Sequence, residues 1–179
     1  MSVLRVVVTG GECTGKSRLA AALAERFGAL WVPEAAREAA LTKKGPLGPE
    51  DVEPIARAHV AASDNALRES RQQGARLLVL DQDLLSTAVY ARHYYGSCPA
   101  WIEAAALERK ADLYLLCHPD VPWVADPARD RPDRREEIHG LFAGALERAR
   151  ARVLDIRGGF DERCRTAAGA IEAALREGD

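Results

Sequence analysis

The sequence predicts an α/β fold in which a doubly wound, parallel sheet of five strands is flanked by helices. Short apolar runs alternate with longer segments of helical pattern, and continuous apolar runs are typical of parallel strands buried on both faces. A glycine-rich loop joins the first run to the first helical segment. No internal repeat or linker divides the chain, so we expect residues 1–179 to form a single domain.

Each element is expected where its local pattern indicates it. The runs expected to form strands are residues 3–8, 30–32, 77–81, 113–117 and 153–156. The helices are expected at residues 16–28, from residue 33, at 51–73, 86–95 and 101–110, up to residue 152, and at 161–176. We expect His59, within the long third helix, to be structural, because no acidic or cysteine cluster lies near it in the sequence.

Composition excludes several classes of function. The chain has 179 residues, of which 47% are apolar and 29% charged, with a net charge of −2, so a nucleic acid is not expected as the main partner. No apolar run reaches membrane-spanning length and no export pattern opens the chain, so we expect a cytoplasmic protein without a membrane partner. The four cysteines lack metal-ligand spacing and are expected to be reduced thiols. The oligomeric state is not predicted.

The loop after the first strand has the spacing G-x-x-x-x-G-K-S of a phosphate-binding loop. Its glycines let successive backbone amides face a phosphate, and the start of the next helix adds a positive dipole end. Lys16 is expected to reach the β- and γ-phosphates during catalysis, and Ser17 to ligate Mg²⁺. The alternative is an ordinary glycine turn. The expected ATP-binding residues are Gly10, Gly11, Glu12, Cys13, Thr14, Gly15, Lys16 and Ser17.

A second acidic signal ends the third strand. Asp81 follows a continuous apolar run, as in a Walker-B strand, and is expected to hold Mg²⁺ directly or through water. Asp83, or Glu34 if the geometry favours it, is expected to orient the acceptor hydroxyl and to take its proton. The alternative role for Asp83 is the N-cap of the helix that follows.

Two further segments carry charges suited to a ligand. Glu34 and Arg37 lie three residues apart after the second strand, at the sheet edge where ligands bind, although they also fit a solvated ion pair. An arginine-rich stretch follows the fourth strand, where Arg129 and Arg131 are expected to neutralise charge on the transferring phosphoryl group. The alternative for this stretch is an exposed, salt-bridged loop.

Four ordered motifs resemble the kinase domain of the bacterial NadR-type proteins, the ribosylnicotinamide kinases. They are V-V-T-G-G-E-C-T-G-K-S at residues 7–17, V-P-E-A-A-R-E at 32–38, D-Q-D-L-L-S-T at 81–87, and P-D-V-P-W-V-A-D with Arg129 from residue 119. The resemblance implies a P-loop fold of the nucleoside-kinase type with a lid at about residues 119–135. It also implies ATP-dependent phosphorylation of the ribose 5′-hydroxyl of nicotinamide riboside, a step of NAD biosynthesis. The site residues that it implies are the loop from Gly11 to Ser17 with Glu34, Arg37, Asp81, Asp83, Asp126 and Arg129.

The sequence departs from the family pattern at the lid. Pro127 stands where the family usually has glycine, and further arginines follow Arg129, so the catalytic arginine is not fixed by sequence. The DNA-binding and adenylyltransferase regions of the multi-domain members have no counterpart here, so we expect neither dinucleotide synthesis nor repression. The alternatives are a kinase of another nucleoside or small metabolite, and a P-loop ATPase or switch without a small-molecule acceptor.

Overall fold

The computed structural model describes residues 2–43, 45–122 and 134–178. Within them lies a five-stranded sheet of order β2-β3-β1-β4-β5 in which every neighbouring pair is parallel. The strands are β1 (Leu4–Thr9), β2 (Leu30–Val32), β3 (Leu77–Asp81), β4 (Leu113–Cys117) and β5 (Val153–Ile156). The predicted fold class and the five predicted strands are confirmed.

Helices fill the intervals between the strands, as predicted. They are α1 (Lys16–Phe27), α2 (Ala35–Lys43), the short 3₁₀ helix η1 (Pro49–Asp51), α3 (Val52–Gln72), α4 (Leu84–Tyr95), α5 (Ala100–Glu108), α6 (Arg135–Arg148) and α7 (Phe160–Glu177). The helix expected to reach residue 152 ends at Arg148, because Arg150 adopts a positive φ of 48° that an α-helix cannot contain. The helix expected from Pro33 begins at Ala35, which places Glu34 just before its first turn.

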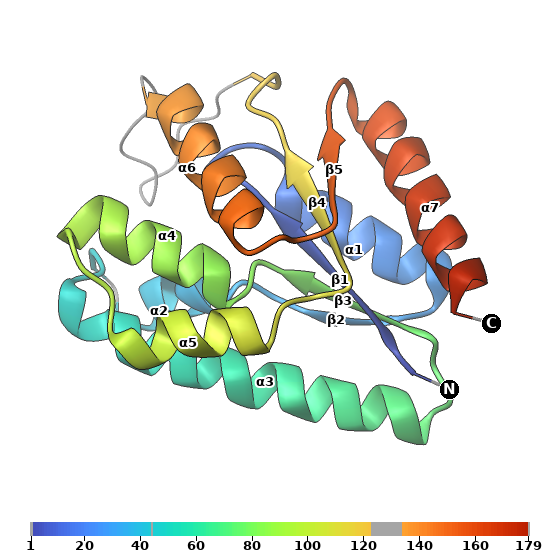
Figure 1. Cartoon of the computed structure of the whole chain (residues 1–179), viewed down its shortest axis with the longest axis horizontal. Coiled ribbons are helices and arrows are strands. Elements are labelled where there is room, and N and C mark those ends of the chain that lie inside the picture. The colour runs from blue at the N-terminus through green and yellow to red at the C-terminus, as the bar shows by residue number, and fades with distance from the viewer. Residues whose placement is uncertain (1, 44, 123–133, 179) are drawn as a thin grey trace.

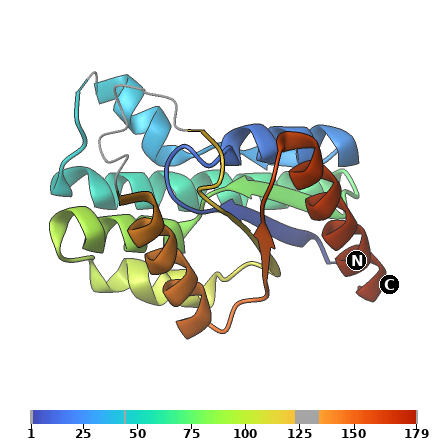
Figure 2. The same ribbon diagram turned by 90° about the horizontal axis from the view of Figure 1, so that it is seen from above.

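The sheet separates two apolar cores, which gives three layers (Figures 1 and 2). Alternate residues of a strand point to opposite faces of a sheet. Val7 accordingly packs in the core beneath α3, α4, α5 and α6, whereas Val6 and Val8 pack in the core beneath α1 and α7. Phe142 of α6 and Ile171 of α7, both 0% exposed, lie at the centres of the two cores. This packing fixes the carboxyl ends of the central strands at one edge.

At the centre of that edge, β1 ends and the glycine loop begins. Val8 of β1 pairs with Asp81 of β3, so the loop and the acid lie on neighbouring strands. Gly10 turns at φ 131°, and a Cβ atom there would lie 2.7 Å from the carbonyl oxygen of Cys117 at the end of β4. Only glycine allows the chain to leave the sheet at this point.

Among the helices of the described residues, none is both long enough and apolar enough to cross a membrane.

Replacing Gly10 tests this constraint. We expect Gly10→Ala to lower the free energy of unfolding by about 2 kcal/mol or more, because the methyl group meets the β4 backbone and φ becomes strained. Gly28→Ala is the matched control, since Gly28 has φ 59° but open space around a Cβ, and it should cost about 1 kcal/mol. Urea unfolding measures both, and equal losses would contradict the role given to the Cys117 contact.

Candidate active site

The glycine loop between β1 and α1 curls through several left-handed residues. Gly10, Cys13 and Gly15 have φ values of 131°, 55° and 78°. Such turns bring successive backbone amides to one side, where they form a concave anion site. The start of α1 at Lys16 lies directly behind the loop. The loop therefore has the form that its sequence predicts.

Lys16 lies at the heart of this loop. Lys16 is only 7% exposed, and its ammonium donates a hydrogen bond to the carbonyl oxygen of Gly11 at 2.6 Å. The hydroxyl of Thr14 donates to the same oxygen at 2.9 Å. A buried ammonium beside a ring of amides is the arrangement that binds the phosphate tail of a nucleotide.

Asp81 ends β3 with its carboxylate buried beside the loop. The residue is 1% exposed, and within the described part of the chain neither carboxylate oxygen has a hydrogen-bond donor. Burial raises the pKa of the Asp81 carboxyl above its usual value, and the nearby Ser17 hydroxyl and the charges of Lys16 and Arg37 offset this only in part. A buried carboxylate without a donor normally has a cation for a partner.

These residues fit the Mg²⁺ ion that accompanies a nucleotide. The orphaned oxygens of Asp81 lie near the Ser17 hydroxyl, and both are oxygen ligands of the kind that Mg²⁺ prefers. Across residues 2–43, 45–122 and 134–178, no group of three or more His, Cys, Asp or Glu side chains is placed to hold a metal. Sparse protein ligation suits Mg²⁺, which is usually held by one or two carboxylates together with phosphates and water.

Asp83 has a different environment from Asp81. Its Oδ1 accepts hydrogen bonds from the amide and hydroxyl of Ser86, at 3.0 and 3.2 Å, which caps α4. Its Oδ2 accepts the hydroxyl of Tyr114 at 2.7 Å. The structure thus gives Asp83 the capping role. Its predicted role toward an acceptor hydroxyl stays a prediction.

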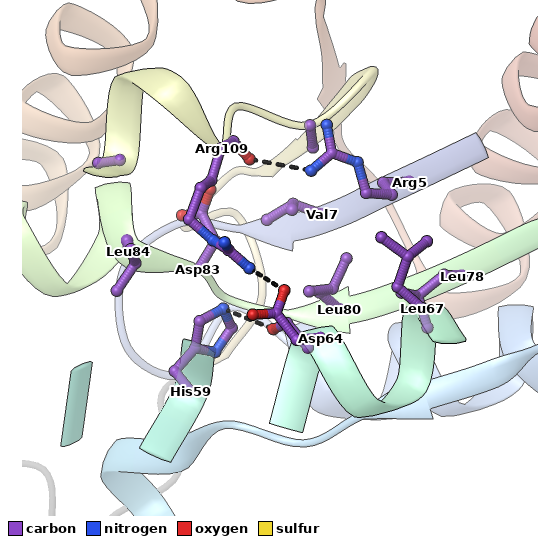
Figure 3. A pocket seen from close by; sticks show the side chains of 13 residues that line it. Arg5, Val7, His59, Asp64, Leu67, Leu78, Leu80, Asp83, Leu84 and Arg109 are labelled. Carbon is purple, nitrogen blue, oxygen red and sulfur yellow. Dashed lines mark hydrogen bonds and ion pairs between the residues drawn. The ribbon is translucent and has the colours of Figure 1, made fainter. Parts of the chain in front are cut away.

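Beneath Asp83 lies a cavity of about 40 Å³, between the sheet and helices α3 and α5 (Figure 3). Its polar lining includes His59, Asp64, Asp83 and Arg109, and Arg109 pairs with Asp64 across it. The volume suits a few water molecules, which is too little for a nucleoside. The carboxylate of Asp83 therefore faces a small internal cavity.

His59, which was expected to be structural, is buried in α3, and its surroundings differ from the expectation. It is 6% exposed and hydrogen-bonds the hydroxyl of Ser63 at 3.1 Å. Burial lowers the pKa of His59 below its usual value, and the Asp83 carboxylate opposes that shift. Acidic side chains do lie beside it, because the fold brings Asp83 from a distant part of the chain.

On the other side of the loop, acidic and aromatic side chains gather. The hydroxyl of Tyr94 donates to Glu12 at 3.1 Å, and the ring of Tyr94 stacks on Tyr90 with 6.0 Å between centroids. Burial raises the pKa of Tyr90 well above its usual value, and the charges of Glu34 and Glu12 add to this rise. The structure therefore brings Glu34 to the loop, next to an aromatic surface on α4.

One residue that supports the site, Gln82, lies within the motif at 81–87 but was not among the predicted site residues. Gln82 follows Asp81 at φ 71° and accepts a hydrogen bond from the Thr9 hydroxyl at 3.2 Å. Its amide donates to the carbonyl of Gly10 at 3.4 Å, so it links the acid-bearing strand to the loop. The sequence offered one signal for this role, because Gln82 lies between Asp81 and Asp83, two predicted site residues.

The predicted lid residues cannot be placed in the same way. Asp126, Arg129 and Arg131 fall within residues 123–133 and so lie outside the described residues. Of the predicted lid at about 119–135, the structure describes residues 119–122, 134 and 135.

The fold and the loop together define a P-loop NTPase. The family model described as an AAA domain matches residues 5–163, which is most of the chain. The chain belongs to this AAA domain family.

Curated relatives point to one group of proteins within that class. The chain is 28% identical over 151 residues to the trifunctional NAD biosynthesis/regulator protein NadR of Escherichia coli K12, covering 81% of the chain and 36% of the relative. It is 29% identical over 131 residues to NadR of Salmonella typhimurium LT2, covering 71% and 31%. The resemblance to NadR-type proteins is thus confirmed, and the chain spans about a third of the length of these relatives.

Solved structures agree with the fold. A NadR protein in complex with NR matches with a TM-score of 0.77 at 24% identity, over 96% of this chain and 51% of that one. A NadR protein in complex with NAD and AMP-PNP matches with a TM-score of 0.78 at 22% identity, over 96% and 49%. Thymidylate kinase from Ehrlichia chaffeensis matches with 0.68 at 13% identity, over 96% and 99%. At these identities the likeness establishes the P-loop kinase fold.

The contrast between the two aspartates gives a prediction about stability. We expect Asp81→Asn to raise the free energy of unfolding of the ligand-free protein by about 1 kcal/mol, because it removes a buried charge that has no donor among residues 2–43, 45–122 and 134–178. Asp83→Ala should lower it by about 2 kcal/mol, because α4 loses its cap and Tyr114 its acceptor. Urea unfolding in the presence of EDTA measures both.

The sign of the pH dependence follows from the raised pKa of Asp81. The native state holds the proton more tightly than the unfolded chain, so the charged carboxylate weakens the fold at neutral pH. The advantage of Asp81→Asn should be largest above the folded pKa and should shrink as the pH falls toward the ordinary carboxyl value. A stability loss on Asp81→Asn at pH 7 would show that the carboxylate has a donor in solution.

Proposed function

We propose that this chain transfers the γ-phosphoryl group of ATP to the ribose 5′-hydroxyl of nicotinamide riboside, giving nicotinamide mononucleotide. The observation that carries the proposal is the buried Asp81 carboxylate, which has no donor in the described part of the chain, beside a phosphate loop that presents Lys16. NadR proteins whose solved structures hold NR, or NAD with AMP-PNP, have the same fold, which supports this choice of donor and acceptor. The activity is proposed for residues 1–179 as one kinase domain, in the cytoplasm.

In the proposed reaction, the phosphate loop binds the phosphates of ATP. The amides from Gly11 to Ser17 bind the phosphates, and Lys16 exchanges the Gly11 carbonyl for phosphate oxygens. Ser17 and Asp81 would hold Mg²⁺, which supplies positive charge to the phosphates when bound. The sequence resemblance supports Arg129 and Arg131 as residues that neutralise charge on the transferring group, and Asp126 as a lid residue that contacts the acceptor.

The acceptor end needs a carboxylate that can orient a hydroxyl and take its proton. As the acceptor oxygen bonds to the γ-phosphorus and the bond to ADP breaks, the hydroxyl proton passes to this carboxylate. Asp83 and Glu34 are the candidates. Asp83 faces a cavity too small for a nucleoside, whereas Glu34 lies near Tyr90, whose hydroxyl contacts the Gly10 carbonyl of the loop. This contrast supports Glu34.

The aromatic surface next to Glu34 suits the proposed acceptor. Nicotinamide riboside has a flat, positively charged ring, and such rings bind tyrosine faces and carboxylates. Tyr90 and Tyr94 supply the faces, and Glu12 and Glu34 supply negative charge. We infer that Arg37 contacts the ribose or the phosphate, and its influence on the pKa of Asp81 supports this role.

An acceptor panel tests the proposed function. We expect Mg-ATP consumption to depend on nicotinamide riboside and to match the mononucleotide formed, as measured by chromatography. Lys16→Ala is the matched inactive control and should retain its fold. Phosphorylation of other nucleosides but not of nicotinamide riboside would contradict the acceptor, and ATP loss without any acceptor would indicate an ATPase or switch.

The two candidate carboxylates are separated by paired variants. We expect Glu34→Gln to lower kcat by about 100-fold while leaving the Kd for Mg-ATP unchanged, because only proton acceptance is lost. Asp83→Asn, with its cap and its Tyr114 partner altered, should lower thermal stability more than turnover. Steady-state kinetics and melting curves measure these effects. Full loss of turnover in folded Asp83→Asn, with Glu34→Gln active, would assign the hydroxyl to Asp83.

A further inference from the structure

Several carbonyl groups of the phosphate loop accept hydrogen bonds from side chains outside the loop. Gln82 and Tyr90 donate to the carbonyl of Gly10 at 3.4 and 3.5 Å. Two arginines from later in the chain donate to the carbonyls of Cys13 and Thr14. Neither arginine belongs to the phosphate-loop motif.

Arg163 on α7 is the more deeply buried of the two arginines. It is 2% exposed, and one of its terminal nitrogens donates to the carbonyl of Thr14 at 2.8 Å. Its other groups donate to the carbonyl of Gly158 at 2.8 Å, to the carbonyl of His118 at 3.0 Å, and to the carboxylate of Asp120. Since Asp120 offsets its charge, the guanidinium acts mainly through the directions of its donors.

Arg135 makes the equivalent contact from the first turn of α6. A terminal nitrogen donates to the carbonyl of Cys13 at 3.1 Å and to the carbonyl of Val121, beyond the end of β4, at 2.9 Å. The side chain is partly buried. It therefore ties the loop to the chain that follows β4.

These contacts decide where the loop's amides point. A peptide unit is planar, and its C=O and the N–H of the next residue point in opposite directions. When Arg135 holds the Cys13 carbonyl outward, the amide of Thr14 faces the concave side. When Arg163 holds the Thr14 carbonyl outward, the amide of Gly15 does the same. Amides oriented in advance bind an anion without first reorganising.

We propose that Arg163 and Arg135 are positioning residues that set the phosphate loop in its triphosphate-binding conformation by holding the carbonyls of Thr14 and Cys13. The inference rests on the proposed function, because it assumes that the loop binds a nucleoside triphosphate. Neither arginine touches the reacting atoms, so the effect is on affinity for the phosphate tail and not on the chemical step.

The test compares each arginine with an exposed arginine on the same helix. The variants are Arg163→Lys, Arg163→Ala and Arg135→Ala, and the controls are Arg165→Ala on α7 and Arg148→Ala on α6, which remove the same charge from exposed sites. Calorimetry gives the Kd for Mg-ATP and for magnesium tripolyphosphate, and steady-state kinetics give KM and kcat with nicotinamide riboside.

We expect Arg163→Ala and Arg135→Ala each to raise the Kd for both probes, and the KM for ATP, by about tenfold, with Arg163→Lys in between. The kcat and the KM for the acceptor should stay near wild type, and both controls should match wild type. A purely structural role would instead lower the melting temperature and leave the Kd of the folded protein unchanged, which would overturn the inference.

Three further outcomes are also decisive. If Arg163→Ala does not fold, the result with the partly buried Arg135→Ala decides, because unchanged affinity there overturns the shared role. If the wild-type protein binds no Mg-ATP, the proposed function fails. If the wild type binds Mg-ATP and the variants bind like their controls, the inference about the arginines fails and the proposed function stands.

Discussion

The close approach of Gly10 to the backbone of Cys117 is the constraint on which the site depends. With 2.7 Å between a Cβ at position 10 and the Cys117 carbonyl oxygen, only glycine can occupy the point where β1 ends. Because β1 is the central strand, the loop emerges between the ends of β3 and β4. Asp81 reaches the loop from one side, and the residues after β4 reach it from the other. A site assembled from neighbouring strand ends is the general solution of open parallel sheets.

The two carboxylates at the end of β3, Asp81 and Asp83, differ in their surroundings: those of Asp81 suit ligand binding, and those of Asp83 suit stability. Among the described residues, the buried Asp81 carboxylate has no hydrogen-bond donor, which we expect to destabilise the ligand-free protein and which suits a cation. Asp83, two residues later, has a hydrogen-bond donor for each carboxylate oxygen. Through Tyr114 it links the start of α4 to β4. Gln82 lies between them at φ 71° and turns the chain so that the two side chains enter different environments. Strain of this kind is common where a ligand site meets a packed core.

The likeness to NadR covers this chain well but covers only about a third of the curated relatives. In the proposed function, the phosphate loop and the acid of β3 carry the phosphoryl transfer. The proposed specificity for the acceptor rests on other residues, namely Glu34, Tyr90 and Tyr94. The same scaffold in thymidylate kinase shows that the fold does not choose the acceptor.

The sequence by itself determined the five strands, the fold class and the form of the phosphate loop, because strand burial and glycine spacing are local patterns. It also placed Asp81 correctly at the end of a buried strand. Only the tertiary structure decided that Asp83 and His59 line the same small cavity. It also decided that Arg163 donates a hydrogen bond to a loop carbonyl 149 residues away in the sequence. Local pattern sets which element a residue belongs to. The partner of a buried polar group is set by which elements pack together, and no short-range spacing records that.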